Sequence, residues 1–341
     1  MKAIQVLGAY QATVAEVPDP VLAPGQALVK IRAMGICGTD VATYKAINVN
    51  VKSYPIIIGH EIAGEIAEID ENNEYGFKKG DKVVLDPYMF CGHCYPCEQG
   101  RTNCCEDMHC LGVHCTGAMS EYFAHPISML RKIPQDMPWE MAAVAEPLVI
   151  SMHGVHTVGV KPGEHMAVIG AGAIGLLAAM GCKAYGGIPI LIDPVQERLD
   201  MAKEWGIDHV INPATQDAVA EISKLTNGRM AECVMEASGS IPGVKNTLDY
   251  AAYTGRIALT GWPKGPVELP TNLITKKELT VRGSRNGAGE FEECIDLIYS
   301  GRVPAQKIIT RVVDFEELPQ ALDDLAKRPG DFLKVVGLIK D

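Results

Sequence analysis

Three side chains far apart in the sequence are of the types that a catalytic zinc ion accepts. Cys37 offers a thiolate, His60 an imidazole and Glu146 a carboxylate. A catalytic zinc site keeps one position open for water or substrate, so three protein ligands are enough. Glu61, next to His60, is the expected neighbouring carboxylate that adjusts the coordination. Each residue alone also fits an ordinary core position, and Glu146 could instead be satisfied by an Arg or by a helix N-terminus.

A second cluster of potential metal ligands is rich in cysteine. Six cysteines lie within twenty residues, at positions Cys91, Cys94, Cys97, Cys104, Cys105 and Cys110. With Cys105 as the fourth ligand the spacing is C-x2-C-x2-C-x7-C, which suits a closed structural zinc site. Spacing alone leaves the choice between Cys104 and Cys105 open. An iron–sulfur cluster is the alternative, because the first three cysteines have ferredoxin-type spacing, although the fourth comes late.

A glycine turn indicates a dinucleotide site. It follows the buried strand 167–169, precedes an apolar helix that ends near residue 185, and comprises Gly170, Ala171, Gly172, Ala173, Ile174 and Gly175. Glycines there allow a tight turn, close approach of a pyrophosphate and close helix–strand packing, and the helix dipole favours the phosphates. Asp193 follows the next strand, 190–192, and would bind ribose hydroxyls and repel a 2′-phosphate. The motif therefore predicts NAD rather than NADP.

The elements that must carry these residues change type along the chain. Residues 1–150 hold short β-type runs between Gly and Pro turns, which predicts a β-rich unit with its Cys and His residues on irregular loops. Residues 140–156 have a helical pattern. Strands and helices then alternate over residues 151–284, and residues 285–341 are expected to return to the first unit. The strands expected in between are 167–169, 190–192, 209–211, 233–236, 257–260 and 279–282, and they predict an α/β, doubly wound parallel sheet of six strands.

Composition limits the classes of function. A chain of 341 residues with 47% hydrophobic and 21% charged residues is typical of a globular protein of about two domains. A net charge of −11 without a run of Lys or Arg argues against a nucleic-acid partner. The least charged long run, residues 166–182, is shorter than the ~20 apolar residues that a membrane span needs. The first six residues read as a strand rather than a signal peptide, so a cytosolic protein is expected.

Together these motifs resemble the zinc-dependent medium-chain dehydrogenase/reductases over essentially the whole chain. The matching stretches are Gly35–Asp40, Gly59-His60-Glu61-x-x-Gly64, the cysteine lobe at about residues 88–110, Ala145–Pro147 and the glycine turn. The resemblance implies a GroES-like catalytic domain at residues 1–150, a Rossmann NAD-binding domain at 151–284, and a homodimer or homotetramer. It also aligns Cys105 with the fourth ligand of the structural zinc, so that each chain would bind two zinc ions.

Within the family, a Glu at position 146 resembles the polyol (sorbitol-type) branch. The stretches Gly100–Cys105 and Gly283–Asn286 are similar to those of enzymes that act on sugar acids. The resemblance therefore implies oxidation of a secondary hydroxyl of a polyol or aldonate to a ketone, with hydride transfer to NAD. It carries Arg198, Ser284, Arg285 and Asn286 over as contacts to the cofactor or substrate, although exposed or hinge positions would explain these residues equally well.

The proton relay departs from the family pattern. Thr39 matches the hydroxyl that passes the substrate proton outward, but many relatives continue the relay with a His where this chain has Ala42. The proton is therefore expected to leave through Tyr44, water or the cofactor ribose. L-Threonine or a simple alcohol is an alternative substrate on the same scaffold. A non-catalytic NAD-binding redox sensor is the alternative of another class, and the presence of all four side chains at the first metal centre argues against it.

Overall fold

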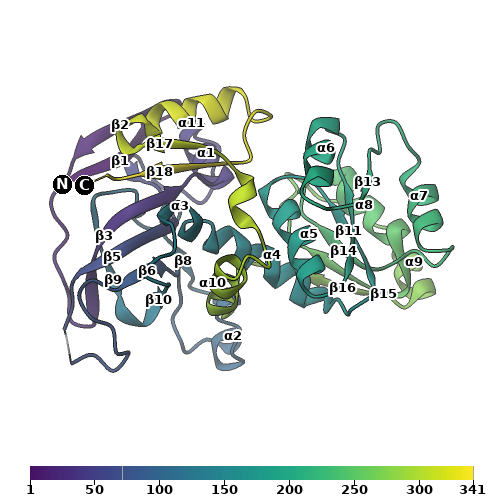
Figure 1. Ribbon diagram of the computed structural model, residues 1–341, viewed down its shortest axis with the longest axis horizontal. Helices are drawn as coiled ribbons and strands as arrows, with labels where there is room; N and C mark the ends of the chain where they lie inside the picture. The colour runs from purple at the N-terminus through teal and green to yellow at the C-terminus, as the bar shows by residue number, and fades with distance from the viewer. Residues whose placement is uncertain (71, 341) are drawn as a thin grey trace. The chain divides into compact units, whose positions relative to one another are not determined.

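The computed structural model describes residues 1–70 and 72–340, which form two compact units (Figure 1). Unit 1 comprises Met1–Glu146, Phe291–Ser300 and Ala305–Asp341, and unit 2 comprises Pro147–Glu290 and Gly301–Pro304. The chain thus leaves unit 1 at Glu146 and returns at Phe291, whereas the sequence places these boundaries at residues 150 and 284. Glu71 and Asp341, in the predicted N-terminal domain and C-terminal return, lie outside the described residues.

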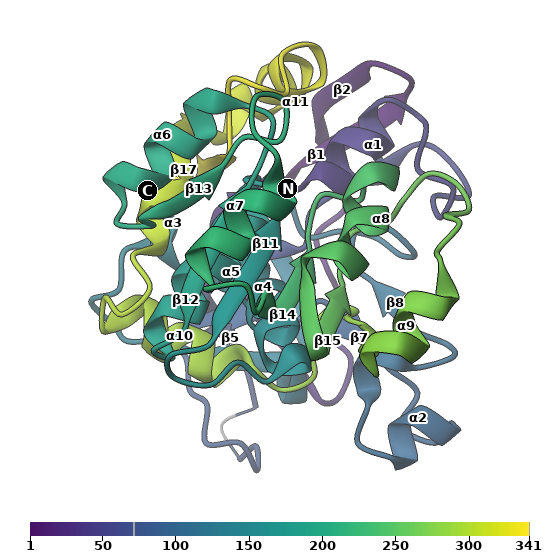
Figure 2. The same ribbon diagram turned by 90° about the vertical axis from the view of Figure 1, so that its right-hand side faces the viewer.

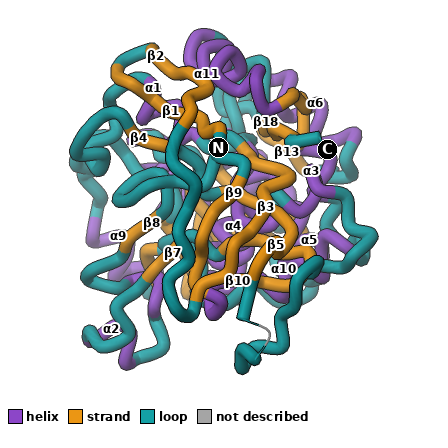
Figure 3. The backbone as a smooth tube through the Cα atoms, turned by 90° about the vertical axis from the view of Figure 1, so that its left-hand side faces the viewer, coloured by secondary structure: helices purple, strands orange, loops and turns teal. Residues whose placement is uncertain are grey.

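Unit 1 is built on a mainly antiparallel sheet of seven strands. Along the sheet the order is β10-β6-β5-β3-β18-β17, and β9 pairs with β3 (Figure 3). These strands are β3 (Gln26–Gly35), β5 (Glu61–Glu68), β6 (Lys82–Leu85), β9 (Tyr122–Pro126), β10 (Leu130–Lys132), β17 (Ile309–Asp314) and β18 (Lys334–Leu338). A three-stranded sheet orders β1 (Lys2–Gly8), β2 (Gln11–Glu16) and β4 (Ile56–Ile57) as β2-β1-β4, and β7 (Tyr88–Met89) pairs with β8 (His109–Cys110).

Strand β3 shows why this sequence forms that sheet. Its residues alternate between fully buried and partly buried positions, as expected of a strand with one face on the core. The inward side chains of β3 and β5, among them Val29, Ile31, Ile62 and Ile66, lie in one hydrophobic core of unit 1. Strand β18 pairs antiparallel with β3, with Gly337 opposite Met34, so the C-terminal segment completes the sheet.

Short helices complete unit 1. They are α1 (Gly38–Tyr44), α2 (Tyr95–Glu98), α3 (Trp139–Ala142), α10 (Phe291–Tyr299) and α11 (Leu318–Lys327), with the 3₁₀ turns η1 (Thr102–Cys104), η2 (Ile127–Met129), η3 (Ala305–Ile308) and η4 (Phe315–Glu317). The run 140–156, predicted as one helix, is two: α3 ends at Ala142, and α4 (Ala145–Val158) begins one residue before Glu146. Cys37 directly precedes α1 instead of lying in an irregular loop, because Asp40 caps this short helix.

Unit 2 contains a parallel sheet of six strands. Its order is β13-β12-β11-β14-β15-β16, the doubly wound arrangement predicted from the alternating pattern (Figure 2). The strands are β11 (His165–Ile169), β12 (Ile188–Ile192), β13 (His209–Ile211), β14 (Ala231–Glu236), β15 (Ala251–Leu259) and β16 (Thr280–Gly283). Strand β11 lies between β12 and β14, so the chain reverses its direction of travel across the sheet at β11.

Helices join the parallel strands of unit 2. They are α5 (Ala173–Ala184), α6 (Gln196–Glu204), α7 (Ala218–Leu225), α8 (Ile241–Tyr250) and α9 (Thr271–Lys277). Helices α6 and α9, like β17 in unit 1, were not predicted. Helix α6 buries only Leu199 and Ala202, and its other residues except Met201 are polar. Pro189, which has no N–H to donate, is the second residue of β12, and the pairing of β12 with β13 begins only at Ile190. Within the described part of the chain, no helix is both long and apolar enough to cross a membrane.

Candidate functional site

The start of helix α1 positions Cys37. The backbone N–H of Cys37 donates to Asp40 Oδ2 at 2.8 Å, which closes the first turn of the helix and fixes Cys37 at its N-terminus. The other oxygen, Asp40 Oδ1, accepts from the backbone N–H of Gly59 at 3.2 Å. Asp40 is fully buried and thus links the Cys37 segment to the residue that precedes His60.

His60 and Glu61 lie where the chain enters strand β5. His60 Nδ1 lies 3.9 Å from Asp40 Oδ1, so the ring presents its other nitrogen, Nε2, away from Asp40. This separation is too long for a hydrogen bond, and His60 Nδ1 is buried without a hydrogen-bond partner within residues 1–70 and 72–340. Burial lowers the pKa of His60, but the charges of Cys37 and Asp40 outweigh it and raise this pKa above its usual value. This negative environment favours a cation.

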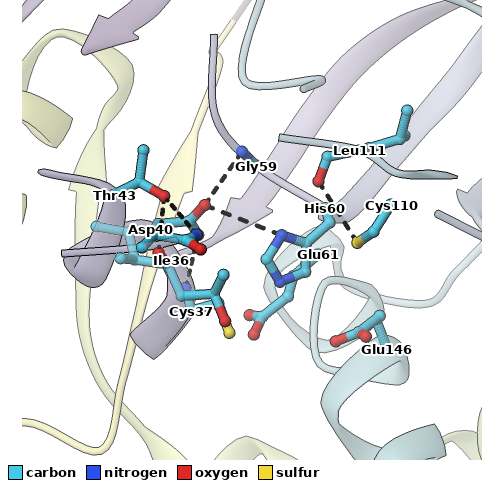
Figure 4. Close-up of polar contacts among 12 residues, drawn as sticks. Ile36, Cys37, Asp40, Thr43, Gly59, His60, Glu61, Cys110, Leu111 and Glu146 are labelled. Atoms are coloured by element: carbon cyan, nitrogen blue, oxygen red, sulfur yellow. Dashed lines mark hydrogen bonds and ion pairs between the residues drawn. The ribbon is translucent and has the colours of Figure 1, made fainter. Parts of the chain in front are cut away.

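The structure brings three of the four predicted residues of the first metal centre together. Ligand atoms of Cys37, His60 and Glu61 all lie within 4.8 Å of one another. Figure 4 shows Glu146 extending its carboxylate toward the same space from the start of helix α4. Among the described residues, the group defined by that 4.8 Å limit does not include Glu146.

The two carboxylates at this place have different partners. Both oxygens of Glu61 accept from Lys334 Nζ, at 2.5 and 2.7 Å, and the Lys334 ammonium also donates to the carbonyl of Ile36 at 3.2 Å. Both side chains are buried, with 5% and 1% of the Lys334 and Glu61 side chains exposed. Gly35 provides the space, because a Cβ atom there would lie 2.0 Å from Glu61 Oε2.

Glu146 is held by a neutral partner instead. Its Oε1 accepts from the hydroxyl of Tyr88, while Oε2, also buried, has no hydrogen-bond partner within residues 1–70 and 72–340. Burial raises the pKa of Glu146 to about 7, so the carboxylate needs a compensating positive charge to be stable in this place. A bound metal ion would satisfy Oε2 and provide that charge.

The cysteine lobe brings four thiols together. Sulfur atoms of Cys91, Cys94, Cys97 and Cys105 all lie within 4.8 Å of one another, and Cys104 is outside this group. The Cys94 and Cys97 sulfurs are 3.4 Å apart, and those of Cys94 and Cys105 are 3.8 Å apart. Helix α2 begins directly after Cys94 and contains Cys97. Cys105 directly follows the turn η1. Four convergent thiols match a closed zinc site.

The thiols of the lobe differ in their protonation. A backbone hydrogen bond from Glu106 lowers the pKa of Cys94 to about 6, whereas burial raises the pKa of Cys97 to about 12. A bound cation favours the thiolate form of all four.

Cys110, which has no assigned role, is buried and lies beside His60 (Figure 4), and burial raises its pKa to about 12. It is therefore a neutral thiol.

The glycine turn has the shape that a dinucleotide requires. It follows β11 and leads into α5, with Gly172 at the helix N-cap position. A Cβ on Gly175 would lie 1.8 Å from the carbonyl oxygen of Gly170, so only glycine allows this close packing. A Cβ on Gly172 would meet nothing within 4 Å, so the space above it is open to a ligand. Ala173 and Ile174 are the first two residues of α5.

Asp193 lies directly after β12, beside this turn. Its Oδ2 accepts from the backbone N–H of Ala171 at 2.7 Å and its Oδ1 from that of Val195 at 2.8 Å, so the carboxylate is fixed against the glycine turn. The other predicted cofactor residues lie on two elements: Arg198 on α6, and Ser284, Arg285 and Asn286 directly after β16. Ser284 is buried, and the turns after β11, β12 and β16 all follow the carboxyl ends of parallel strands.

The predicted relay residues are spread along α1. Thr39 is half-buried and is the second residue of the helix. The Tyr44 hydroxyl lies 3.1 Å from the Tyr10 carbonyl and 3.1 Å from the Asp323 carboxylate. These contacts engage the Tyr44 hydroxyl, and the exit route through Tyr44, water or the cofactor ribose stays a prediction.

Three residues of this site were missed by the sequence analysis. Asp40 joins the backbone of Cys37 to that of Gly59, next to His60. Tyr88 contacts Glu146, and Lys334 contacts Glu61. Asp40 could have been singled out as the last residue of the Gly35–Asp40 motif and a natural helix cap. Tyr88 and Lys334 carry no local signal, because a tyrosine or lysine in a short strand is ordinary and only the fold shows what it contacts.

Comparisons with known proteins give the family. A model described as an alcohol dehydrogenase GroES-like domain matches residues 23–135, and one described as a zinc-binding dehydrogenase matches residues 173–300. An uncharacterized zinc-type alcohol dehydrogenase-like protein of Haemophilus influenzae is 47% identical, over 98% of both chains. L-galactonate-5-dehydrogenase of Escherichia coli is 34% identical, over 90% of this chain and 89% of its own.

The solved structures agree. An alcohol dehydrogenase of Escherichia coli CFT073, solved in complex with NADH, superimposes with a TM-score of 0.91 at 32% identity, and the match covers 99% of each chain. The predicted GroES-like domain, the Rossmann sheet and the resemblance to zinc-dependent medium-chain dehydrogenases are thereby confirmed. The chain belongs to the zinc-binding dehydrogenases with an alcohol dehydrogenase GroES-like domain.

Proposed function

We propose that this dehydrogenase oxidises a secondary hydroxyl of a polyol or aldonate to a ketone, with transfer of the hydride to NAD. The observation that carries the proposal is the group of half-buried Cys37 with buried His60 and Glu61, toward which the unpartnered Glu146 oxygen is directed from α4. L-galactonate-5-dehydrogenase, a relative at 34% identity, supports a sugar acid as the substrate class. A homodimer or homotetramer in the cytosol stays a prediction.

We assign the third ligand of the catalytic zinc to Glu146 rather than Glu61. A carboxylate that already accepts two hydrogen bonds from a buried ammonium, as Glu61 does from Lys334, has its charge compensated. Glu146 Oε2 is buried and accepts no hydrogen bond within residues 1–70 and 72–340. Cys37, His60 and Glu146 would therefore hold the ion, and Cys91, Cys94, Cys97 and Cys105 would hold a second, structural zinc.

The roles of the protein side chains follow from their contacts. Bound zinc would lower the pKa of a substrate hydroxyl, and NAD would accept the hydride. Asp40 ties the Cys37 segment to the residue before His60, and Lys334 compensates Glu61, so that the site keeps its shape without the substrate. The Thr39 hydroxyl, two residues after Cys37, is the group that we assign to accept the substrate proton. With Tyr44 engaged elsewhere, the proton would continue through water or the cofactor ribose.

Asp193 supports NAD over NADP. Its carboxylate accepts hydrogen bonds from the backbone N–H groups of Ala171 and Val195 and is thus held beside the glycine turn, where the adenosine ribose binds in this fold. A fixed negative charge there accepts hydrogen bonds from ribose hydroxyls and repels a 2′-phosphate. We expect Asp193→Ala to reduce the preference for NAD, and a native preference for NADP would contradict the assignment.

The substrate proposal is tested by a screen for NADH formation. Purified protein with zinc is assayed with aldonates, sugar alcohols, inositols, L-threonine and short alcohols, and NADH is followed by its absorbance. We expect the highest kcat/KM with an aldonate or polyol. Highest turnover with L-threonine or a short alcohol would favour the alternative substrate class, and no turnover with any substrate would favour the non-catalytic alternative.

The metal assignment is tested by Glu146→Ala. We expect kcat to fall at least about 10³-fold, because the variant loses both a ligand and the charge balance of the metal centre. NAD affinity, measured by titration calorimetry, should stay within about 2-fold, because the glycine turn lies in unit 2. Glu68→Ala is the matched control, since Glu68 is an exposed carboxylate at the end of β5. Turnover of Glu146→Ala equal to the control would remove Glu146 from the site.

A further inference from the structure

We infer that Tyr88 is a positioning residue that sets how Glu146 meets the catalytic metal ion and that ties this carboxylate to the cysteine lobe. The inference rests on the proposed function, because it requires a metal ion at Cys37 and His60. No motif in the sequence marks Tyr88, and its role follows only from the contacts of its hydroxyl and of its backbone.

The Tyr88 hydroxyl makes the two oxygens of Glu146 inequivalent. It donates to Oε1, and Oε2 is left without a partner within the described chain. Both residues are nearly inaccessible to water, with 6% of Tyr88 and 2% of Glu146 exposed. Water therefore cannot replace the hydroxyl easily, and the carboxylate is held in one orientation.

This orientation has a consequence for coordination. A carboxylate can bind a metal through one oxygen or through both. With Oε1 occupied by the Tyr88 hydroxyl, Glu146 would ligate through Oε2 alone and fill one position instead of two. A catalytic zinc needs a position for the substrate, so the hydrogen bond from Tyr88 would help to keep that position open.

The cysteine lobe fixes Tyr88 in turn. Strand β7 pairs with β8 so that Tyr88 lies opposite Cys110, and the Tyr88 N–H lies 3.3 Å from Asp86 Oδ1. The Tyr88 ring belongs to a small buried cluster with Cys105, Met108, Cys110 and Val113, against which Cys91, Cys94 and Cys97 pack. Cys105, one of the proposed structural-zinc ligands, therefore lies in the same buried cluster as Tyr88, and the lobe connects through this tyrosine to the Glu146 carboxylate.

The test compares Tyr88→Phe with Tyr250→Phe. Each removes one hydroxyl from a buried tyrosine, and Tyr250, whose hydroxyl contacts Asn246, belongs to unit 2. Zinc affinity is measured by competition with a chromogenic chelator, and coordination by the visible absorption of protein with Co²⁺ in the catalytic site. We expect Tyr88→Phe to weaken zinc binding roughly 10- to 100-fold and to lower the Co²⁺ absorption, as a move toward five ligands does, with no change in Tyr250→Phe.

The possible outcomes separate the inference from the function. If Tyr88→Phe behaves like Tyr250→Phe in both measurements while the unaltered protein binds two zinc ions per chain, the inference is wrong and the proposed function stands. If the unaltered protein binds zinc only in the cysteine lobe, the proposed function fails and the inference fails with it.

A second pair of variants shows whether Tyr88 acts through Glu146. In a Glu146→Gln background, Tyr88→Phe should cause little further loss of zinc affinity, whereas fully additive losses would contradict a role through this carboxylate. Tyr88→His, which retains a hydrogen-bond donor, should recover part of the affinity lost in Tyr88→Phe. Equal losses in both variants would indicate a packing effect and overturn the inference. Should Tyr88→Phe fail to fold, Tyr88→His with and without Glu146→Gln provides the same coupling test.

Discussion

Glu61 and Glu146 have chemically similar carboxylates, and both are buried, but their neighbours give them different roles. Glu61 faces a lysine ammonium that compensates its charge, while Glu146 faces a neutral hydroxyl and keeps one oxygen unsatisfied. Desolvation penalises an uncompensated carboxylate far more than a paired one. At the scale of single residues, this difference in compensation marks where a cation belongs.

The glycines of the dinucleotide turn provide a test at the same scale. Gly175→Ala would place a Cβ 1.8 Å from a backbone oxygen and should lower the free energy of unfolding by about 1–3 kcal/mol, because the backbone has to shift. Gly172→Ala meets no protein atom within 4 Å, so it should leave folding nearly unchanged and weaken NAD binding. Urea unfolding and calorimetry distinguish the two variants. Equal NAD affinity in Gly172→Ala and the unaltered protein would show that the cofactor does not approach this glycine.

At the scale of elements, short segments that are distant in sequence meet at the proposed metal centre. Cys37 precedes α1, His60 and Glu61 open β5, Glu146 lies in the first turn of α4, and Lys334 begins β18. None of these elements is long, and α1 has only seven residues. Their stability comes from the sheet of unit 1 rather than from local propensity.

The buried ion pair between β18 and β5 should be a large stability element. Lys334→Met leaves Glu61 buried without its cation, and we expect the free energy of unfolding to fall by about 3–5 kcal/mol. Lys340→Met is the matched control, because Lys340 lies in the same terminal segment as Lys334 and forms an exposed ion pair with Asp314. The control should unfold at nearly the same urea concentration as the unaltered protein. Similar midpoints for both variants would show that the buried pair contributes little.

Strand β9 should make stability depend on pH through His125. This residue is buried with Nε2 2.9 Å from the Asp86 carbonyl, and burial lowers its pKa to about 4. Between pH 6.5 and pH 4, His125 binds a proton in the unfolded chain, where its pKa is about 6.5, but stays neutral in the folded chain. The contribution of His125 is therefore full above pH 6.5 and is lost as the pH falls toward 4, by roughly 2 kcal/mol between pH 7 and pH 5.

The measurement isolates this residue from an opposing one. Burial raises the pKa of Asp86 to about 6, so its contribution has the opposite sign and declines as the pH rises through that window. We therefore compare the unaltered protein with His125→Gln, which keeps a donor and cannot titrate. The fall in the free energy of unfolding from pH 7 to pH 5 should be smaller in His125→Gln. An equal fall in the two proteins would show that His125 accepts a proton in the folded state.

At the scale of the whole molecule, unit 2, which contains the glycine turn, is inserted into the sequence of unit 1, which contains the proposed metal ligands. The chain leaves unit 1 directly after Glu146, and α10, α11 and β18 belong to unit 1 again. Strand β18 pairs with β3, so the last segment of the chain is part of the core of the first unit. Loss of β18 would therefore remove Lys334 and also the strand that lies between β3 and β17 in the sheet of unit 1.

Metal analysis checks the whole-molecule prediction of two zinc ions per chain. Adjacent cysteines of the lobe provide matched variants, because Cys105 belongs to the four-thiol group and Cys104 does not. We expect two zinc ions in Cys104→Ser and one in Cys105→Ser, measured by emission spectroscopy of the purified protein. One zinc ion in Cys104→Ser and two in Cys105→Ser would reverse the assignment of the fourth ligand.

The sequence by itself determined the family, the parallel sheet of six strands and the residues with metal-binding chemistry, because these depend on local patterns. The spacing of the glycines, of Cys91, Cys94 and Cys97, and of Asp193 is short enough to be read along the chain. Helices such as α6 could not be predicted from the sequence, because a mostly polar helix with two buried residues has almost no hydrophobic periodicity.

Only the tertiary structure decided which groups face one another. Lys334 compensates Glu61, and Tyr88 contacts Glu146. Lys334 and Glu61 are 273 residues apart, and Tyr88 and Glu146 are 58 apart, so no local pattern can encode these pairs. The physical reason is that desolvation and hydrogen bonding act through space, and the fold alone sets which atoms share a buried environment.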